Sequence, residues 1–408
     1  MNDRSACPHG RDDRLTARLA PPIDGPAFER DDDGVIVRGF APARAVLRAS
    51  GTRQAGFKAE LMDRKPGDGR APILFLEGKE HHEQRRRTAP FFTPKTVREK
   101  HRSLMEAEAD RLVARVHRRG RGDLSNFGME MATAVTARIV GLTEKSNAAM
   151  ARRINAFFTD PLDDSGGRAR QIWSALKAQF RLMRFYFSDV RPAIAARRAE
   201  AEAGNPRDDV ISHLLQQGYS RVEILTECVT YAAAGIVTTR EFLSVALWHL
   251  LSNDDLRRTY LASEETDRLA ILEEILRLEP VVGTIYRRAL EPVELPSGET
   301  IPKGTKIAID VRAANADTEV AGECPFQAMP GREPAGRAGS PMLSFGDGHH
   351  RCPGAPLAIL ESDILLTRLL ALPGIRMVRD PKLGWNELVT GYELRDVQLV
   401  CDRASKAA

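Results

Sequence analysis

The segment from Ser220 to about Ser252 constrains the fold most, because its pattern predicts one uninterrupted long helix. Ser220 and Glu223 form a capping-box pair at its start, since each side chain can satisfy the backbone amide of the other residue. At 1.5 Å per residue the helix would span roughly 48 Å, enough to cross a globular protein. No charged residue occurs from Cys228 to Thr239. We therefore expect a central helix that is buried on most sides.

Composition excludes several classes of protein. The chain has 408 residues, of which 42% are hydrophobic and 28% are charged, so it can bury a large core and is not collagen-like, disulfide-rich or wholly disordered. Its 60 basic and 56 acidic residues give a net charge of +4, which is too little to indicate nucleic-acid binding. No run reaches the roughly 18 apolar residues of a membrane span, and charged residues begin the chain. These features predict a cytoplasmic protein without a membrane span.

The chain shows no repeat or linker that would divide it. Residues 1–20 are polar and lack periodicity, so we expect a flexible N-terminal tail followed by a single domain over 21–408. The pattern is mainly helical with short strands. Residues 34–47 predict a strand followed by a helix, and residues 267–278 predict a helix that carries Glu274 and Arg277 on one face. Alternation over 306–311 predicts a small sheet after the helical body.

The segment 345–354 reads FGDGHHRCPG and precedes a strongly apolar helix. Backbone N–H groups at the start of that helix would point at the sulfur of Cys352 and favour its thiolate, which is a metal ligand. A phosphate-binding GxGxxG loop does not fit, because Arg351 stands where the last glycine is needed. The surrounding Gly and Pro residues also argue against a merely structural cysteine. The five cysteines form no CxxC pair, which argues against a zinc site and a disulfide framework.

This segment resembles the haem-binding loop of cytochromes P450, FxxGxHxCxG, at Phe345, Gly348, His350, Cys352 and Gly354. The resemblance implies a mainly α fold with small β-sheets, in which haem b (iron protoporphyrin IX) lies between a long distal helix and a proximal cysteine loop. It implies that Cys352 ligates the iron as a thiolate and that Phe345 shields the sulfur. Gly348 and Gly354 would permit the backbone to approach the porphyrin.

Other motifs of the family follow in order over about residues 30–400. Glu274 and Arg277 match the structural ExxR pair, for which Arg332 is a candidate third member. The HxxxR pattern is matched by His81 and Arg85. The resemblance implies that the haem propionates are bound by a set of four residues: His81, Arg85, Arg287 and His350. Cationic donors suit carboxylates because charge-assisted hydrogen bonds are short and strong.

The predicted long helix resembles the distal helix, whose family pattern is AGx(D/E)TT. This chain reads Ala234-Gly235-Ile236-Val237-Thr238-Thr239. The resemblance implies that Ala234 and Gly235 leave room for oxygen and substrate, and that the Thr238 hydroxyl assists proton delivery.

The chain departs from the pattern at Val237, which cannot carry a proton where the family has an acid. Three accounts remain open. Water or the substrate supplies the proton, Glu241 substitutes, or the chemistry needs no such relay. Glu241 lies one turn later, about 6 Å from Val237 on the same face, but pairing with Arg240 would leave both structural.

The resemblance implies a haem-thiolate monooxygenase that uses dioxygen and two electrons. No flavin or nucleotide module fits in the chain, so the expected donors are a ferredoxin and a ferredoxin reductase. The basic residues Arg85, Arg86, Arg87, Lys95, Arg98, Lys100 and Arg102 would steer an acidic partner. Two alternatives are peroxide-driven chemistry and a haem protein that binds ligands without turnover.

Substrate identity is weakly encoded. The resemblance places six residues in the substrate pocket: Tyr231, Ala234, Val281, Val282, Ile285 and Leu388. Parts of the segment 173–187 are expected to line it as well. These residues are mostly apolar, which favours a mid-sized, largely hydrophobic substrate with a polar anchor. Abundant Arg and Ala are consistent with a bacterial enzyme of specialised metabolism.

Overall fold

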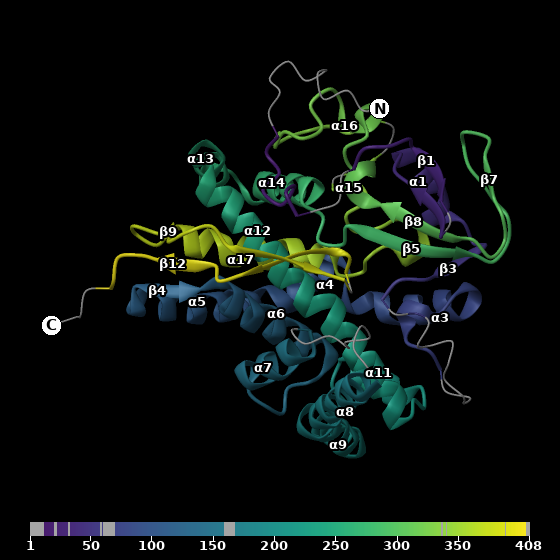
Figure 1. Cartoon of the computed structure of the whole chain (residues 1–408). Helices are drawn as coiled ribbons and strands as arrows, with labels where there is room; N and C mark the ends of the chain where they lie inside the picture. Colours follow the sequence, from purple (N-terminus) through teal and green to yellow (C-terminus); the bar gives the residue numbers. More distant parts are fainter. Residues whose placement is uncertain are drawn as a thin grey trace.

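The computed structural model describes residues 12–19, 23–31, 33–57, 59, 70–158, 168–335, 338–339, 341–387 and 389–404. Helices form most of the molecule, and two sheets lie at opposite ends of it (Figure 1). The α-helices are α1 (Phe40–Arg48), α3 (Gly78–Thr88), α4 (Pro94–Thr96), α5 (Arg102–Arg119), α6 (Leu124–Val140), α7 (Asn147–Phe158), α8 (Arg168–Phe185), α9 (Arg191–Glu202), α10 (Val210–Gln216), α11 (Arg221–Ala232), α12 (Thr238–Ser252), α13 (Asp254–Ala262), α14 (Glu265–Leu278), α15 (Val311–Ala314), α16 (Thr318–Ala321) and α17 (Ala355–Leu370). This composition confirms the expected mainly α fold with small sheets.

Short helical turns connect several of these helices. Three are 3₁₀ turns: η2 (Ile73–Phe75), η3 (Ala89–Phe91) and η7 (Gly348–His350). Three are π-helical: η4 (Val97–His101), η5 (Tyr186–Val190) and η6 (Ala233–Val237).

The larger sheet has five strands in the order β1-β2-β8-β5-β3. Only β2 and β8 pair in parallel among these strands, with Val35 opposite Ile307. A three-stranded sheet has the order β4-β12-β9, and β6-β7 and β10-β11 form two-stranded units. The strands are β1 (Phe28–Asp31), β2 (Gly34–Val37), β3 (Thr52–Gln54), β4 (Arg121–Asp123), β5 (Thr284–Ala289), β6 (Val293–Glu294), β7 (Thr300–Ile301), β8 (Lys306–Asp310), β9 (Arg376–Met377), β10 (Lys382–Asn386), β11 (Gly391–Arg395) and β12 (Gln398–Val400).

The predicted long helix runs from Arg221 to Ser252 as α11, η6 and α12 (Figure 1). Its capping box is formed, because the Ser220 side chain accepts from the Glu223 amide and the Glu223 side chain accepts from the Ser220 amide. The π turn in its middle was not predicted. π turns are single-turn bulges that often mark functional sites in helices.

Most of this helix lies in the larger hydrophobic cluster, together with α5, α6, α14 and α17. Every residue of α12 from Thr239 to Leu250 is buried. Among the described residues it is the one helix with the length and apolar content to cross a membrane. Burial of α12 inside the protein accounts for that composition, as it does for other core helices.

Two expectations from the sequence need correction. Residues 12–19 are not a loose tail, since the Leu15 and Thr16 amides and the Thr16 hydroxyl all donate to the buried carboxylate of Glu279. Residues 1–11 and 20 lie outside the described chain. Cys324 is disulfide-bonded, so a cross-link exists that cysteine spacing did not predict.

Candidate active site

The loop that carries Cys352 is fixed on both sides. Its amide donates to the carbonyl of Phe345 at 2.8 Å, and α17 begins directly after Gly354. Gly348 has a φ of +68°, and a Cβ there would lie 2.4 Å from the carbonyl oxygen of Leu47 in α1. Gly348 is therefore required by the packing of α1 against the loop, and its expected role in the approach to a cofactor stays a prediction.

The Cys352 thiol lies deep among protein atoms and yet has exposed surface, so it borders an interior space. Burial raises the pKa of this thiol. Hydrogen bonds from the Gly354 and Ala355 amides and the charges of Arg85 and Arg351 oppose that effect. The predicted amide donors are thus in place, and a bound metal cation would complete the deprotonation.

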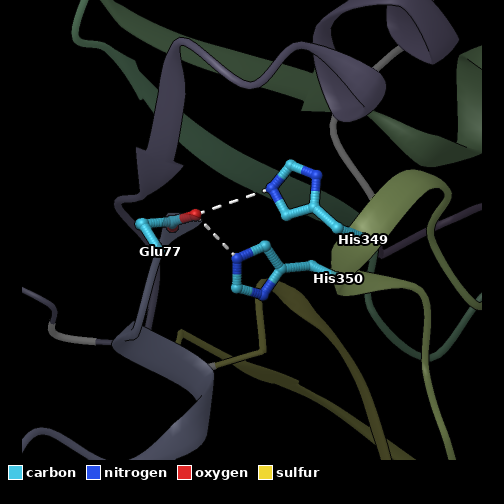
Figure 2. Close-up of side chains that lie close together, drawn as sticks. All are labelled: Glu77, His349 and His350. Atoms are coloured by element: carbon cyan, nitrogen blue, oxygen red, sulfur yellow. Dashed lines mark hydrogen bonds and ion pairs between the residues drawn. The ribbon is translucent and has the colours of Figure 1, made fainter. Parts of the chain in front are cut away.

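A cluster of imidazoles surrounds Glu77 beside this loop (Figure 2). The Glu77 carboxylate lies 2.9 Å from His350 Nε2 and 3.6 Å from His349 Nε2. Burial would raise the Glu77 pKa, but the hydrogen bond and charge of His350 leave it lowered. The rings of His81 and His350 stack with centroids 4.0 Å apart. Two predicted propionate partners, from α3 and the cysteine loop, are therefore in contact.

The surroundings disfavour the cationic forms of these imidazoles that we expected. Burial, followed by the charges of His350 and Arg85, lowers the His81 pKa to about 3. Burial also lowers the pKa of His350, although Glu77 opposes the change. Positive charge at the site therefore comes from the arginines, which stay charged at neutral pH.

Arg85 and Arg287 supply that charge. Arg85 donates to the Arg351 carbonyl at 2.5 Å and interacts electrostatically with both Cys352 and Tyr231. Arg287 is 3% exposed, and burial lowers its pKa to about 10. Its Nη1 donates to Gln54, whereas its Nε and the Nδ1 of His81 are buried polar atoms without a partner. Buried donors left unpaired are costly, so they fit a ligand that brings acceptors such as carboxylates.

The distal helix changes conformation at the π turn η6. Ala234 is exposed in the middle of a core helix, and the Thr238 hydroxyl donates to the Ala234 carbonyl at 2.5 Å. A Cβ at Gly235 would lie 2.9 Å from Thr136 Oγ1 of α6. Gly235 therefore serves the packing of α6 against the helix, and like Ala234 and Thr238 it keeps accessible surface.

Glu241 does not take the place of the missing acid. Its carboxylate, 1% exposed, accepts from Arg240 at 2.6 Å, from Arg395 at 2.8 Å and from the Leu394 amide at 2.7 Å. These contacts direct it to β11 and satisfy both oxygens. The structural alternative for Arg240 and Glu241 is therefore the one that the geometry supports. Val237 is itself 2% exposed.

The ExxR residues form a buried triad. The Glu274 carboxylate accepts from Arg277 at 2.7 Å and from Arg332 at 2.9 Å. Arg277 also donates to the carbonyls of Asn315, Pro325 and Gln327. Arg332 is thus brought to the pair, as its position in the sequence suggested.

The expected pocket residues are only partly assembled. Tyr231, Val282 and Ile285 are partly exposed, which allows them to line a ligand space. Val281 is buried in the larger hydrophobic cluster, so it does not line the pocket as expected. Leu388 lies outside the described residues.

Comparison with known proteins decides the family. The cytochrome P450 family model matches residues 269–372. Pulcherriminic acid synthase of Bacillus subtilis is 29% identical over 337 residues, covering 78% of this chain and 79% of its own. Mycinamicin IV hydroxylase/epoxidase of Micromonospora griseorubida is 28% identical over 385 residues, covering 91% and 88%. The chain belongs to the cytochrome P450 family.

Solved P450 structures agree with the fold. The crystal structure of CalO2 superposes with a TM-score of 0.75 at 23% identity, covering 95% of this P450 and 94% of that chain. The hydroxylase HmtN gives a TM-score of 0.75 at 22% identity, covering 98% and 100%. At this identity the likeness concerns the fold.

The cofactor of this P450 is haem b, which family members hold through a cysteine thiolate. The cysteine loop and the unpaired donors of Arg287 and His81 fit an iron porphyrin with two propionates. When bound, haem supplies the iron centre at which dioxygen is activated. The enzyme is a P450 monooxygenase.

Glu77 and His349 are site residues that sequence reasoning missed. Glu77 precedes His81 by four residues, and His349 adjoins His350. The four-residue spacing of Glu77 from His81, one helical turn, could have identified Glu77 from the sequence. That the His349 side chain points toward Glu77 could be seen only in the folded loop.

Glu361 in α17 gives a test of how burial affects this helix. It is 2% exposed, its Oε1 has no partner, and burial raises its pKa to about 8. The unfolded chain releases this proton near pH 4.5 while the folded protein keeps it, so the stability contributed by protonated Glu361 falls as pH rises from about 4.5 to 8. We expect Glu361→Gln to raise the free energy of unfolding at pH 8.5 by about 4 kcal/mol and to change it little at pH 4.5.

Urea unfolding followed by circular dichroism at both pH values measures this effect. Glu99→Gln is the matched control, because Glu99 is exposed on η4. The prediction is contradicted if Glu361→Gln changes the free energy of unfolding by the same amount at both pH values.

Proposed function

We propose that this P450 uses dioxygen and two electrons from a ferredoxin and its reductase to oxidise a mid-sized, mostly hydrophobic small molecule in bacterial specialised metabolism. Cys352 is the iron ligand in this proposal, and His81, Arg85, Arg287 and His350 hold the propionates. The observation that carries it is the arrangement around Arg85, which lies near both the Cys352 sulfur and Tyr231 of the distal helix. A porphyrin between those two elements would have its iron next to the sulfur.

The residues of the chain divide the work around the cofactor. The Gly354 and Ala355 amides hold the sulfur, and Arg85 and Arg287 neutralise the carboxylates. Phe345 packs partly buried beside the larger hydrophobic cluster, which suits a shield for the sulfur. The Thr238 hydroxyl, bonded to the Ala234 carbonyl, can turn to pass a proton at the open side of the helix.

Relatives support the substrate class. Two relatives are named pulcherriminic acid synthase and mycinamicin IV hydroxylase/epoxidase, and the structural neighbour HmtN is described as a post-tailoring hydroxylase involved in himastatin biosynthesis. Apolar side chains of α8 and η5, including Trp173, Phe180 and Phe187, are more than half exposed and suit an apolar substrate. Soret spectra of the purified protein, recorded across a compound library, would identify ligands by the low-spin to high-spin change. Location in the cytoplasm is part of this proposal.

The electron donor is expected to dock on basic residues of α3 to α5. Arg86, Lys95 and Arg98 are exposed there. Arg98 pairs with Glu265 at 3.5 Å and Lys100 with Asp208 at 2.6 Å, so part of the charge is balanced internally. Exposed pairs contribute little to stability, and their reversal should leave the fold intact.

We expect the charge-reversal variant R86E/R98E to accept electrons from an acidic ferredoxin at least about ten-fold more slowly at low salt. Stopped-flow reduction measures the rate, and the difference should shrink at high salt. Reversal of two exposed arginines elsewhere, R152E/R198E, is the control. Equal rates for both variants at low salt would contradict docking at this surface.

Val237 gives a second test. We expect Val237→Asp to raise the fraction of electrons recovered in product, and the rate of product formation by up to about 100-fold, the lower end of what a positioned acid contributes. Val237→Asn is the matched control, since it has a similar shape and no acidic proton. Product per NAD(P)H and peroxide release are measured together. If Asp and Asn behave alike, this position does not limit proton delivery.

Peroxide-driven oxidation is the second candidate function, and the absence of an acid at Val237 favours it. This candidate is supported if hydrogen peroxide alone, without redox partners, gives product as fast as ferredoxin and its reductase do. Product formed only with ferredoxin and reductase supports the first candidate.

A further inference from the structure

β4 and β12 pair at one end of the molecule (Figure 1). A basic groove lies beside them. It is a hollow of about 540 Å³ lined by Arg118, Arg119, Arg121, Gly122, Asp123, Gln398 and Arg403. Figure 1 shows this end opposite α3, which carries His81 and Arg85. The groove therefore belongs neither to the haem site nor to the basic surface of α3 to α5.

The backbone that carries these arginines is held in place. Arg121 pairs with Val400 in the β4-β12 ladder. The Cys401 amide donates to the Gly120 carbonyl at 3.1 Å, and the Ala404 amide donates to the His117 carbonyl at 3.3 Å. The C-terminal segment is thus fixed along the end of α5. The backbone segments that carry the arginines are held by hydrogen bonds. Binding a ligand therefore costs less conformational entropy than it would on a flexible segment.

Gly120 shows that Arg403 is closely packed here. A Cβ at Gly120 would lie 2.7 Å from Cγ and 3.1 Å from Nε of Arg403. Gly120 also has a φ of +68°, where it ends α5. The turn therefore leaves the space that the Arg403 side chain needs to lie over it.

The positive charge of the groove is not balanced within the described chain. No ion pair among the described residues involves Arg118, Arg119, Arg121 or Arg403, and all four are exposed. The one carboxylate in the lining, Asp123, caps α6 by accepting from the Ser125 amide and hydroxyl and from Asn126. Asp402 lies against Gly374, where a Cβ would meet its carboxylate at 2.6 Å. Both nearby acids are thus committed elsewhere.

Stabilisation of the α5 C-terminus explains only part of this charge. Arg118 and Arg119 lie in the last turn, where cations interact favourably with the helix dipole. Arg121 and Arg403 lie outside the helix, on β4 and after β12. Four arginines from three segments of the chain line one hollow, and guanidinium groups suit bidentate contacts to phosphate oxygens.

We propose that this groove binds a compact, multiply charged phosphate anion of the diphosphate class. Its volume is in the range of small-molecule sites. Four positive charges and one negative charge match an anion that carries about three charges at neutral pH. The bound anion would lie far from the haem, so it acts as a separate ligand of the enzyme.

Isothermal titration of the holoenzyme with inorganic pyrophosphate at low salt tests the proposal. We expect saturable binding that weakens at least about ten-fold in R121Q/R403Q, because each charge-assisted contact is worth a factor of this size. The carbon monoxide spectrum and circular dichroism of the variant should match those of the parent. R152Q/R198Q removes two exposed arginines elsewhere and should bind as the parent does.

Three outcomes would overturn the proposal. In the first, pyrophosphate fails to saturate the parent. In the second, the two variants weaken equally, which would indicate general charge attraction. The third outcome is tested by comparing the binding of the protein to phosphatidylglycerol vesicles with its binding to phosphatidylcholine vesicles. If the parent binds these anionic vesicles through Arg121 and Arg403 and does not bind pyrophosphate, the groove recognises a lipid surface instead of a small anion.

Discussion

Replacing Cys352 by serine is expected to remove the red-shifted Soret band that the reduced protein gives with carbon monoxide, and to reduce oxygenase turnover to background. A hydroxyl keeps the size of the side chain but is a poor donor to iron compared with a thiolate, and it cannot supply the electron density that the thiolate gives. The Cys352 amide would still donate to Phe345, so the loop should keep its shape. The loss would therefore be one of ligation and not of folding.

Cys401→Ser is the matched control for this experiment. Cys401 is also a free thiol, is 8% exposed, and its sulfur lies 3.9 Å from the Val116 carbonyl in a different part of the chain. The control should keep both the band and the activity. A Cys352→Ser protein that retains the band would show that another residue holds the iron, and the proposed site would have to move.

Local signals in the sequence predicted the elements that build this site. The capping box at Ser220 and Glu223, the glycine-rich loop before α17 and the ExxR spacing each depend on residues a few positions apart. Such patterns are set by helix and turn geometry, so they can be recognised without the fold. The long helix and the cysteine loop were therefore placed correctly.

The roles of individual residues could not be predicted in this way, because they depend on contacts between residues far apart in the sequence. Gly235 and Gly348 were expected to leave room for oxygen, substrate or haem, and the structure adds that they make room for α6 and α1. Glu241 looked like a replacement acid until Arg395, 154 residues away, was found against it. Partners at such distances leave no periodic signal in a single sequence. The π turn of η6 likewise left no signal in the residue pattern that we used.

Replacing Glu274 by alanine is expected to lower the free energy of unfolding by about 3–5 kcal/mol, because the buried Arg277 and the partly buried Arg332 would both lose their carboxylate. Urea unfolding measures the loss. Glu265→Ala is the control, since Glu265 is partly exposed, pairs with Arg102 and Arg98 near the surface, and should cost less than about 1 kcal/mol. Equal losses for the two variants would contradict a special role for the triad.

The apolar double variant E274L/R277M distinguishes two roles of Arg277. One is to pair with Glu274, and the other is to clamp the segment 315–327 through its carbonyls. Replacing a buried pair by apolar residues of similar size often restores stability, because neither member is left as a lone charge. In this triad Arg332 would keep its charge and lose the Glu274 carboxylate, so the recovery would be incomplete even without a clamp. Arg277, however, also donates to the carbonyls of Asn315, Pro325 and Gln327, and methionine would leave all three without that donor. We therefore expect the double variant to remain as destabilised as R277M alone and to hold less haem, since the clamped segment leads to the cysteine loop. Recovery to the stability of the parent would mean that Arg277 serves only to neutralise Glu274.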